Sequence, residues 1–331
     1  MKELKVLELF GGIGACTKAL KRLEIPHKVV DYVEIDKCAV KSYNAMNGTN
    51  YEPQDICKWD KDIKVDLIMH GSPCQDFSLA GKQAGGDKDS GTRSSLMYET
   101  IRIVEKLKPK YVIWENVKNL LSNKHIHNFD AYLTRLRMLG YWSYFQVLDA
   151  KDYGIPQNRE RVFVVSIRND VNSYGCHINN YRFPEKQELK LTLKDMLESE
   201  VDKKFYLKDE LTNTFAFRPK SDNSNVIGDL IMDKWQECIK RVYDINKYAP
   251  TLSTMQGGYR KPKILVEDNK IRELTPLECW RLMGFDDEDY NKAAKVNSNT
   301  QLYKQAGNSI VVNVLEAILK NLLLNTEQVE D

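Results

Sequence analysis

The sequence lacks any C-x-x-C pair and has only five histidines among 331 residues, so it shows no zinc signature. It also lacks an excess of charge of one sign, because 49 Lys and Arg stand against 47 Asp and Glu, a formal net charge of +2. This balance excludes a polycation of the histone type but is compatible with a local basic groove. No apolar run of 18 residues occurs and Met1-Lys2-Glu3 leads directly into a strand-like segment, so we expect neither a transmembrane span nor a signal peptide.

The composition that is present is typical of a globular protein, with 42% hydrophobic and 29% charged residues. A chain of this length is expected to form about two domains. The seven cysteines are odd in number and irregularly spaced, which is typical of a reduced protein. We therefore expect a cytoplasmic location.

The first half of the sequence alternates short β-branched segments with helical patterns. The expected strands are Lys5–Leu9, Val29–Val33, Val65–Met69 and Tyr111–Trp114, and the expected helices include Ser95–Leu107 and His127–Leu139. Strands separated by helix-length segments predict a parallel sheet with helices on both faces. Tyr144–Leu148 and Arg161–Ile167, joined by a turn-rich segment, predict an antiparallel addition at one edge of that sheet.

The pattern changes after Arg168. Residues 169–248 are polar and weakly periodic, and they are too many for a loop, so we expect a second, smaller domain. Thr275, Pro276 and Glu278 predict a helix start with a capping box. The apolar stripe of Ile310–Leu324 predicts a final helix that packs back on the first domain.

Several residues that suit ligand binding follow the expected strands. Phe10–Gly14 lies where the first strand gives way to the first helix, and its glycines allow close approach of a ligand to the backbone, although such a turn also occurs where nothing binds. Glu34 ends the second strand, where a carboxylate can accept both ribose hydroxyls. Asp55, which we assign to the end of a third strand, suits an adenine amino group.

A thiol and a carboxyl group are expected side by side at the same edge of the sheet. Cys74 follows the strand Val65–Met69, and Glu115 directly follows the strand Tyr111–Trp114. This pairing suits nucleophilic addition with proton assistance. Arg159 and Arg161, two residues apart in an extended segment, are expected to point to the same side and together could hold anionic or carbonyl oxygens. Taken alone, the pattern favours a solvated, charged turn.

Together these motifs resemble the DNA cytosine-5 methyltransferase family of the bacterial or phage type. The motifs that match, in order, are Phe10–Gly14, Pro73-Cys74-Gln75, Glu115-Asn116-Val117, Gln157–Arg161 and Gln305–Ser309, with finer matches at Thr251-Leu252, Gly257-Gly258, Arg272–Pro276 and Arg281–Phe285. The match spans nearly the whole chain outside residues 169–248, and no catalytic position departs from the family pattern.

The resemblance implies an α/β fold, a Rossmann-like S-adenosylmethionine-dependent methyltransferase sheet with a second, smaller target-recognition domain. It implies a catalytic and cofactor-binding domain over 1–168, a target-recognition domain over 169–270 and a return segment over 271–331. The cofactor would be S-adenosylmethionine, with S-adenosylhomocysteine as product. The residues implied to bind it are Phe10, Gly11, Gly12, Ile13, Gly14, Glu34, Ile35, Asp55, Ile56, Pro73, Leu96, Asn308 and Ser309.

The resemblance also implies a chemistry on a cytosine that is flipped out of double-stranded DNA. Cys74 would add to C6, Glu115 would hydrogen-bond or protonate N3, and Arg161 would hold O2 with Arg159 beside it. Asn116 would support the rim loop. The implied DNA contacts are Gln75, Ser78, Gln83, Arg159, Thr251, Gly257, Gly258, Arg260 and Lys261.

Two basic stretches rich in aromatic residues, 203–220 and 247–263, suit phosphate contact and base reading in the second domain. We expect a monomer without a membrane partner, associated with the nucleoid through its DNA binding. A cognate restriction endonuclease, where one exists, would act separately.

Three other functions are compatible with parts of this sequence. A dinucleotide oxidoreductase would use a similar sheet, but the full G-x-G-x-x-G spacing is missing and Cys74 and Glu115 stay unexplained. A tRNA cytosine-5 methyltransferase of the same family is the runner-up, although the Cys-Phe-Thr tripeptide of that branch is absent from this sequence. A DNA-binding paralogue without activity usually lacks the Cys or the Glu, and both are present here.

Overall fold

The computed structural model describes residues 2–73, 96–171, 181–219, 221–222, 224–232, 236–255, 257, 259–266 and 270–324. The predicted site residues Cys74, Gln75, Ser78, Gln83 and Gly258 lie outside these ranges. Within them, two β-sheets form, one of six strands and one of five. No helix in the described ranges is long and apolar enough to cross a membrane.

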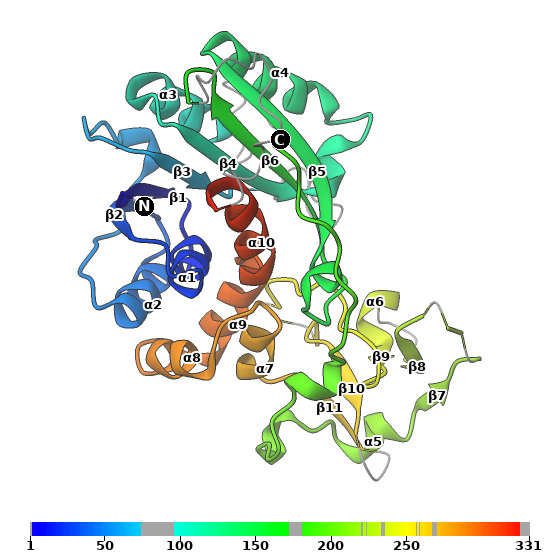
Figure 1. Cartoon of the computed structure of the whole chain (residues 1–331). Coiled ribbons are helices and arrows are strands. Elements are labelled where there is room, and N and C mark those ends of the chain that lie inside the picture. The colour runs from blue at the N-terminus through cyan, green and yellow to red at the C-terminus, as the bar shows by residue number, and fades with distance from the viewer. Residues whose placement is uncertain are drawn as a thin grey trace.

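The six-stranded sheet has the order β2-β1-β3-β4-β6-β5 (Figure 1). Its strands are β1 (Leu4–Leu9), β2 (His27–Val33), β3 (Leu67–His70), β4 (Tyr111–Val117), β5 (Tyr141–Asp149) and β6 (Glu160–Arg168). Strands β2, β1, β3 and β4 pair in parallel, whereas β6 pairs antiparallel with both β4 and β5. The predicted parallel sheet and its antiparallel edge are confirmed.

Helices cover both faces of this sheet, because its central strands are apolar on both sides. Within the described ranges the α-helices are α1 (Ala15–Arg22), α2 (Lys37–Asn47), α3 (Met97–Leu107), α4 (Ile126–Met138), α5 (Asp209–Thr212), α6 (Glu237–Lys240), α7 (Pro276–Arg281), α8 (Asp287–Ala294), α9 (Asn299–Asn308) and α10 (Val312–Leu323). On β1, Val6 belongs to the core cluster that includes Leu315 of α10, and the next residue, Leu7, belongs to the cluster that includes Ile101 of α3. Figure 1 shows α3 and α4 on one side of the sheet and α1 with α10 on the other.

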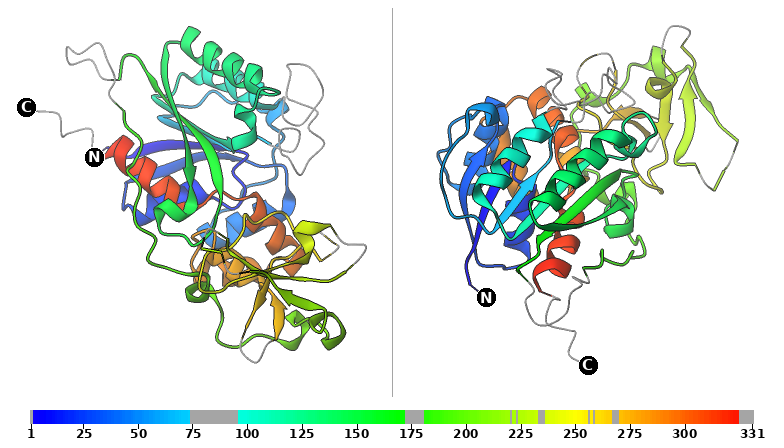
Figure 2. Two further views of the ribbon diagram at one scale, coloured as in Figure 1. Left: turned by 90° about the vertical axis from the view of Figure 1, so that its right-hand side faces the viewer. Right: turned by 90° about the horizontal axis from the view of Figure 1, so that it is seen from above.

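The second sheet is smaller and lies beside the first, as both views in Figure 2 show. Its order is β11-β10-β9-β8-β7, and its strands are β7 (Phe215–Phe217), β8 (Val226–Leu230), β9 (Arg241–Tyr243), β10 (Lys263–Leu265) and β11 (Ile271–Glu273). All neighbours pair antiparallel except β9 and β10, which run in parallel. The strands of this second sheet are too short to show a periodic apolar pattern. The sequence therefore predicted a domain here without any of its strands.

The start of α7 follows the predicted capping box. Thr275 Oγ1 accepts the N–H of Glu278, and the Glu278 carboxylate accepts the N–H of Thr275, with Pro276 in the first turn. Arg272 donates two hydrogen bonds to the same carboxylate, at 2.8 and 2.6 Å, and both side chains are buried. This buried, bidentate pair joins the second sheet to α7.

Two expected positions need correction. Strand β4 continues to Val117, because Glu115 and Val117 pair with Phe163 and Arg161 of β6, so Glu115 stands within the strand and not after it. The polar pair Glu115-Asn116 concealed this extension in the sequence. Asp55 does not end a third strand: it caps the 3₁₀ helix η1 (Ile56–Lys58), which precedes β3.

Candidate active site

The glycine-rich turn after β1 is pressed against two tyrosine rings. A Cβ atom at Gly11 would lie 2.6 Å from the ring of Tyr32, and one at Gly14, where φ is 80°, would lie 2.6 Å from the ring of Tyr43. The Tyr32 hydroxyl also donates to the carbonyl of Gly12 at 2.5 Å. Only glycine permits this close packing, which fixes the path of the backbone at the start of α1.

The carboxylate of Glu34 is tied to the same turn. It accepts the N–H of Gly12 at 3.1 Å and the N–H of Asp36 at 2.8 Å. Burial raises the pKa of Glu34, although these hydrogen bonds oppose the shift. The N–H of Gln54 donates to the carbonyl of Glu34 at 2.8 Å, and this bond brings the adjoining Asp55 beside the end of β2.

A second carboxyl group, which sequence reasoning missed, lies behind the turn. Glu8 of β1 is 2% exposed and accepts the N–H of Thr17 at 3.1 Å and the hydroxyl of the same residue. Burial raises the pKa of Glu8 to about 7, and the hydrogen bonds from Thr17 oppose this shift. The signal was present, because a carboxylate between Leu7 and Leu9 in a central strand is unusual.

A hollow at the ends of the central strands brings several predicted residues together. It is lined by Glu8, Leu9, Phe10, Gly11, Gly12, Ile13, Ala15, Cys16, Met69, Gly71, Glu115, Asn308, Ser309 and Ile310. Ligands in such folds bind at this edge of the sheet. The other predicted cofactor residues are not among the lining residues: Gly14, Glu34, Ile35, Asp55, Ile56, Pro73 and Leu96. Ile35 is 68% exposed.

Glu115 forms an ion pair at the wall of this hollow. The Nε atom of Arg161 lies 3.1 Å from its Oε1 atom, and Glu115 is only 9% exposed. Burial raises the pKa of Glu115 above the usual range, although Arg161 and Arg159 oppose the shift. A carboxyl group with a raised pKa can hydrogen-bond as a donor closer to neutral pH than an exposed one.

Arg159 has a different role from the one that its spacing predicted. Its guanidinium donates to the carbonyls of Leu252 at 2.9 Å, Gly307 at 3.0 Å and Ser309 at 2.8 Å. The carbonyl oxygens that it holds belong to the protein's own backbone, and its charge also acts with that of Arg161 to lower the pKa of Glu115. A Cβ atom at Gly307 would lie 2.0 Å from the carbonyl oxygen of Ser253, so the two segments pack backbone to backbone.

The chain just before Cys74 is held by hydrogen bonds from β4. The indole N–H of Trp114 donates to Ser72 Oγ at 2.9 Å, and the Asn116 amide donates to the carbonyl and to Oγ of Ser72, both at 3.3 Å. Ser72 is buried, as are Trp114 and Asn116. This arrangement agrees with the supporting role expected for Asn116.

The candidate DNA contacts differ in how freely they face solvent. Thr251 donates to the carbonyl of Asn158, and Gly257 and Arg260 are exposed. Lys261 is paired with Glu273, with 2.6 Å between its Nζ and Oε2, and lies 5.1 Å from the centre of the Tyr303 ring. Its charge is therefore already balanced within the protein.

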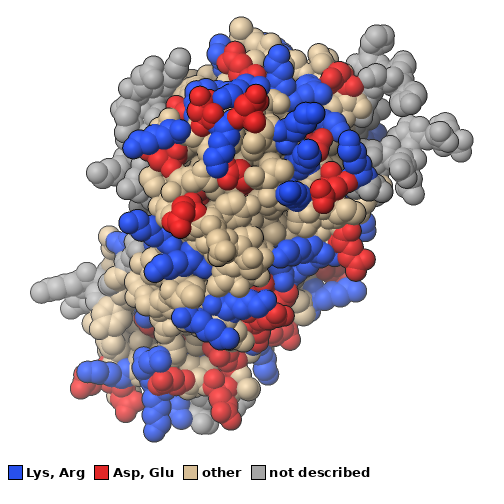
Figure 3. All heavy atoms as spheres, turned by 90° about the vertical axis from the view of Figure 1, so that its left-hand side faces the viewer, with Lys and Arg blue, Asp and Glu red and all other residues tan. Residues whose placement is uncertain are grey.

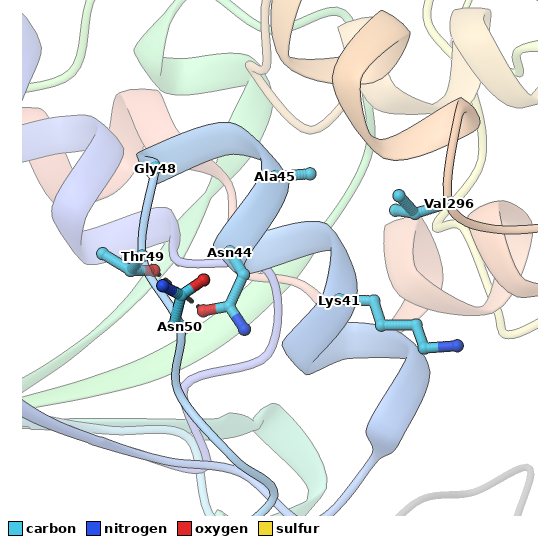
Figure 4. Close-up of a pocket in the computed structure, with 7 residues that line it drawn as sticks. All are labelled: Lys41, Asn44, Ala45, Gly48, Thr49, Asn50 and Val296. Atoms are coloured by element: carbon cyan, nitrogen blue, oxygen red, sulfur yellow. Dashed lines mark hydrogen bonds between the residues drawn. The ribbon is translucent and has the colours of Figure 1, made fainter.

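Two other surfaces carry no comparable arrangement. On the face shown in Figure 3, basic and acidic side chains are interspersed around an uncharged centre. A shallow hollow beside α2 contains Lys41, Asn44, Thr49 and Val296 (Figure 4). There the Asn44 side chain accepts from Thr49 Oγ1 at 2.8 Å and donates to the carbonyl of Tyr51 at 2.8 Å. Asn44 therefore stabilises the loop that follows α2.

Comparisons with known proteins agree with this geometry. A profile described as C-5 cytosine-specific DNA methylase matches residues 4–324. Type II methyltransferase M2.ScrFI of Lactococcus lactis subsp. cremoris is 35% identical, over 96% of this chain and 99% of that protein. Orphan methyltransferase M.SPBetaI of Bacillus phage SPbeta is 32% identical, over 98% of each. The crystal structure of S. pombe Dnmt2 methyltransferase has the same fold, with a TM-score of 0.70 and 21% identity over 98% of this chain and 99% of that one.

The six-stranded sheet, with its glycine turn and the acidic end of β2, defines a Rossmann-like methyltransferase that uses S-adenosylmethionine. The chain belongs to the C-5 cytosine-specific DNA methylase family. It is thus a DNA cytosine-5 methyltransferase, and its substrate is DNA.

Proposed function

We propose that this enzyme methylates C5 of a cytosine flipped out of duplex DNA, through a covalent bond between Cys74 and C6. One observation carries the proposal: a single hollow is lined by the glycine turn of the candidate cofactor site, by Asn308-Ser309 and by the buried carboxyl group of Glu115. A proton donor beside a methyl-donor site is the arrangement that this reaction requires.

The chemistry begins with activation of the ring, because C5 of cytosine is a weak nucleophile. The Cys74 thiolate adds to C6, N3 takes a proton or hydrogen bond from Glu115, and the displaced electron pair makes C5 enamine-like. S-adenosylmethionine, when bound, supplies the electrophilic methyl group. A water molecule then takes the C5 proton, the C5–H electron pair restores the C5–C6 double bond and expels the Cys74 thiolate, and the N3 proton returns to Glu115.

Arg161 is the candidate for holding O2 of the base. Its ion pair with Glu115 supports this role, because the two groups lie where N3 and O2 of one base edge could be bound together. Arg159 enters the proposal as a positioning residue, since its hydrogen bonds hold the backbone of Leu252, Gly307 and Ser309.

The residues at the strand ends fit the parts of S-adenosylmethionine. The ring of Phe10 offers an apolar surface for adenine, Glu34 offers acceptors for the ribose hydroxyls, and Asn308 and Ser309 form the opposite wall. The other proposed contacts, which surround these, are Ile35, Asp55, Ile56, Pro73 and Leu96. Glu8, at the inner end of the hollow, fits the cationic amino group of the methionine part.

The assignment of Glu8 predicts a pH dependence of cofactor binding. Because the pKa of Glu8 is raised to about 7, the carboxyl group is largely protonated at pH 6 and ionised at pH 8. A cationic ligand group favours the ionised form, so affinity for S-adenosylhomocysteine, measured by calorimetry, should rise roughly tenfold between pH 6 and 8.

Adenosine, which lacks the amino-acid part and therefore its cationic amino group, is the ligand control. Its affinity should not change with the titration of Glu8. In Glu8→Gln the rise for S-adenosylhomocysteine should disappear. A rise that persists in Glu8→Gln would assign the titration to Glu34, whose pKa is also raised, and would contradict the proposed role of Glu8.

We further propose that catalysis and cofactor binding belong to residues 1–168, DNA recognition to 169–270 and closure of the cofactor site to 271–331. The five-stranded sheet, which falls almost wholly within the second of these segments, supports this division. The proposed DNA contacts are Gln75, Ser78, Gln83, Thr251, Gly257, Gly258 and Arg260, with Lys261 as a paired neighbour. The enzyme would act as a monomer in the cytoplasm at the nucleoid, and any cognate endonuclease would act separately.

Bisulfite sequencing of DNA from cells that express the chain tests this function. Protected cytosines are expected within one short sequence, and their absence in cells expressing Cys74→Ala is the control. Replacing residues 203–247 with the matching segment of a relative of other specificity should change that sequence while affinity for S-adenosylhomocysteine stays the same. An unchanged target sequence would place recognition outside the exchanged segment.

A further inference from the structure

A lysine in the second sheet is buried, and its ammonium group is bonded to three backbone carbonyls. Lys263, the first residue of β10, is 1% exposed. A buried ammonium group is costly unless its hydrogens are all bonded. Its Nζ donates to the carbonyls of Tyr259 at 2.6 Å, Ile239 at 2.9 Å and Lys261 at 3.3 Å, which matches the three donors of a charged lysine.

These three carbonyls come from two separate segments of the chain. Tyr259 and Lys261 belong to the turn 257–261, and Ile239 belongs to α6, directly before β9. Because β9 and β10 run in parallel, their starts lie at the same end of the sheet, and Lys263 joins the two segments there. The ammonium group thus acts as the common anchor of both segments.

The turn needs such an anchor because its backbone is unfavourable. Met255, Gly257 and Tyr259 all have positive φ, at 49°, 72° and 57°, and two of them are not glycine. Conformations of this kind persist only where surrounding contacts hold them. The other end of the segment is held at the cofactor site, where Arg159 binds the carbonyl of Leu252.

We propose that Lys263, in its charged form, is the positioning residue that fixes the turn 257–261 for contact with the DNA backbone. Tyr259, which is 49% exposed, and Arg260 are the side chains that this turn presents to solvent. The inference rests on the proposed function, in which this segment contacts DNA. Lys263 itself touches no substrate and acts only through the turn.

The proposal predicts a loss of DNA affinity in mild alkali. Burial and the nearby Lys261 lower the pKa of Lys263 to about 8, against the opposing effects of Glu273 and Cys238. Above that pH the neutral amine has two N–H donors and a lone pair, so one of its three carbonyls loses its partner. The charged or titratable groups on the elements around it are Glu237, Cys238, Lys240, Arg241, Tyr243, Tyr259, Arg260, Lys261, Arg272 and Glu273.

The experiment measures binding of the full-length enzyme to a labelled duplex that contains its methylation sequence, with S-adenosylhomocysteine present and salt held constant. Between pH 7 and pH 9 the dissociation constant should increase roughly tenfold. In Lys263→Met it should be raised already at pH 7 and change little with pH. In Lys263→Arg, which stays charged, binding at pH 9 should stay close to that at pH 7.

Controls separate this role from folding and from other titrations. Lys292→Met removes an exposed lysine that pairs with Glu288 on the same helix, and this variant should bind DNA as the unaltered enzyme does. Affinity for S-adenosylhomocysteine should be the same in every variant. A parallel loss of cofactor affinity in Lys263→Met, or a pH dependence that survives in it, would overturn the proposal.

The two levels of the inference fail differently. If Arg260→Ala binds DNA normally, the proposed contact of this segment with DNA is wrong, and the role of Lys263 falls with it. If Arg260→Ala weakens binding but Lys263→Met does not, the proposed function stands and only the role of Lys263 is overturned. Should Lys263→Met not fold, the pH titration of the unaltered enzyme and of Lys263→Arg still decides between these outcomes.

Discussion

Replacing Cys74 with alanine is expected to abolish methyl transfer, because no other group is proposed to add to C6. Duplex DNA with 5-fluorocytosine at the target should trap the unaltered enzyme, since fluorine cannot leave C5 as a proton does. With S-adenosylmethionine present, a complex that survives denaturation should form, and gel electrophoresis would detect it.

The same complex should be absent with Cys74→Ala. Cys57→Ala is a matched control, because Cys57 is an exposed thiol on η1, and it should trap normally. Trapping that persists in Cys74→Ala would move the nucleophile to another cysteine and would remove the proposed role of Cys74.

Glu115→Gln should slow methyl transfer roughly 10²-fold or more, which is the usual cost of losing a positioned acid. The amide keeps the shape of the side chain but cannot transfer a proton to N3. Single-turnover rates would measure the loss, and DNA affinity should change little, since other groups are proposed to hold the flipped base. Glu160→Gln is the control, because this carboxylate is exposed on β6 and pairs with Lys118.

An equal loss of rate and of DNA affinity in Glu115→Gln would indicate a structural residue instead. The pH profile gives a second test. The raised pKa of Glu115 means that the protonated donor persists to a higher pH than in an exposed glutamate, so the single-turnover rate should fall with increasing pH through that shifted titration. This fall should be missing in Glu115→Gln.

The sequence allowed most of the first sheet to be predicted, because its central strands are apolar on both faces and are separated by helix-length segments; local patterns elsewhere in the chain could be predicted too. The capping box at Thr275 and the docking of α10 are examples. Such features depend on residues within a few positions of one another. The strand extension to Val117 was missed because it depends on pairing with β6, far along the chain.

The roles within the site were harder to predict for the same reason. Arg159 was expected beside Arg161, but its partners Leu252, Gly307 and Ser309 lie 93 to 150 residues away in sequence. Lys261 was expected to be free for phosphate, and its pairing with Glu273 depends on the register of β10 and β11. Glu8 was passed over as a strand residue, and its place beside the candidate cofactor site follows from the lining of the hollow.

The contact between Gly307 and Ser253 has a consequence for exchanging recognition modules between relatives. The two backbones touch where a Cβ atom would have no room, and Arg159 joins the carbonyl of Leu252 to those of Gly307 and Ser309. A graft that brings in its own version of residues 251–255 would therefore disturb the wall of the cofactor site. Chimaeras that keep this stretch from the recipient and take only the preceding strands β7, β8 and β9 should retain the recipient's methyl-donor affinity.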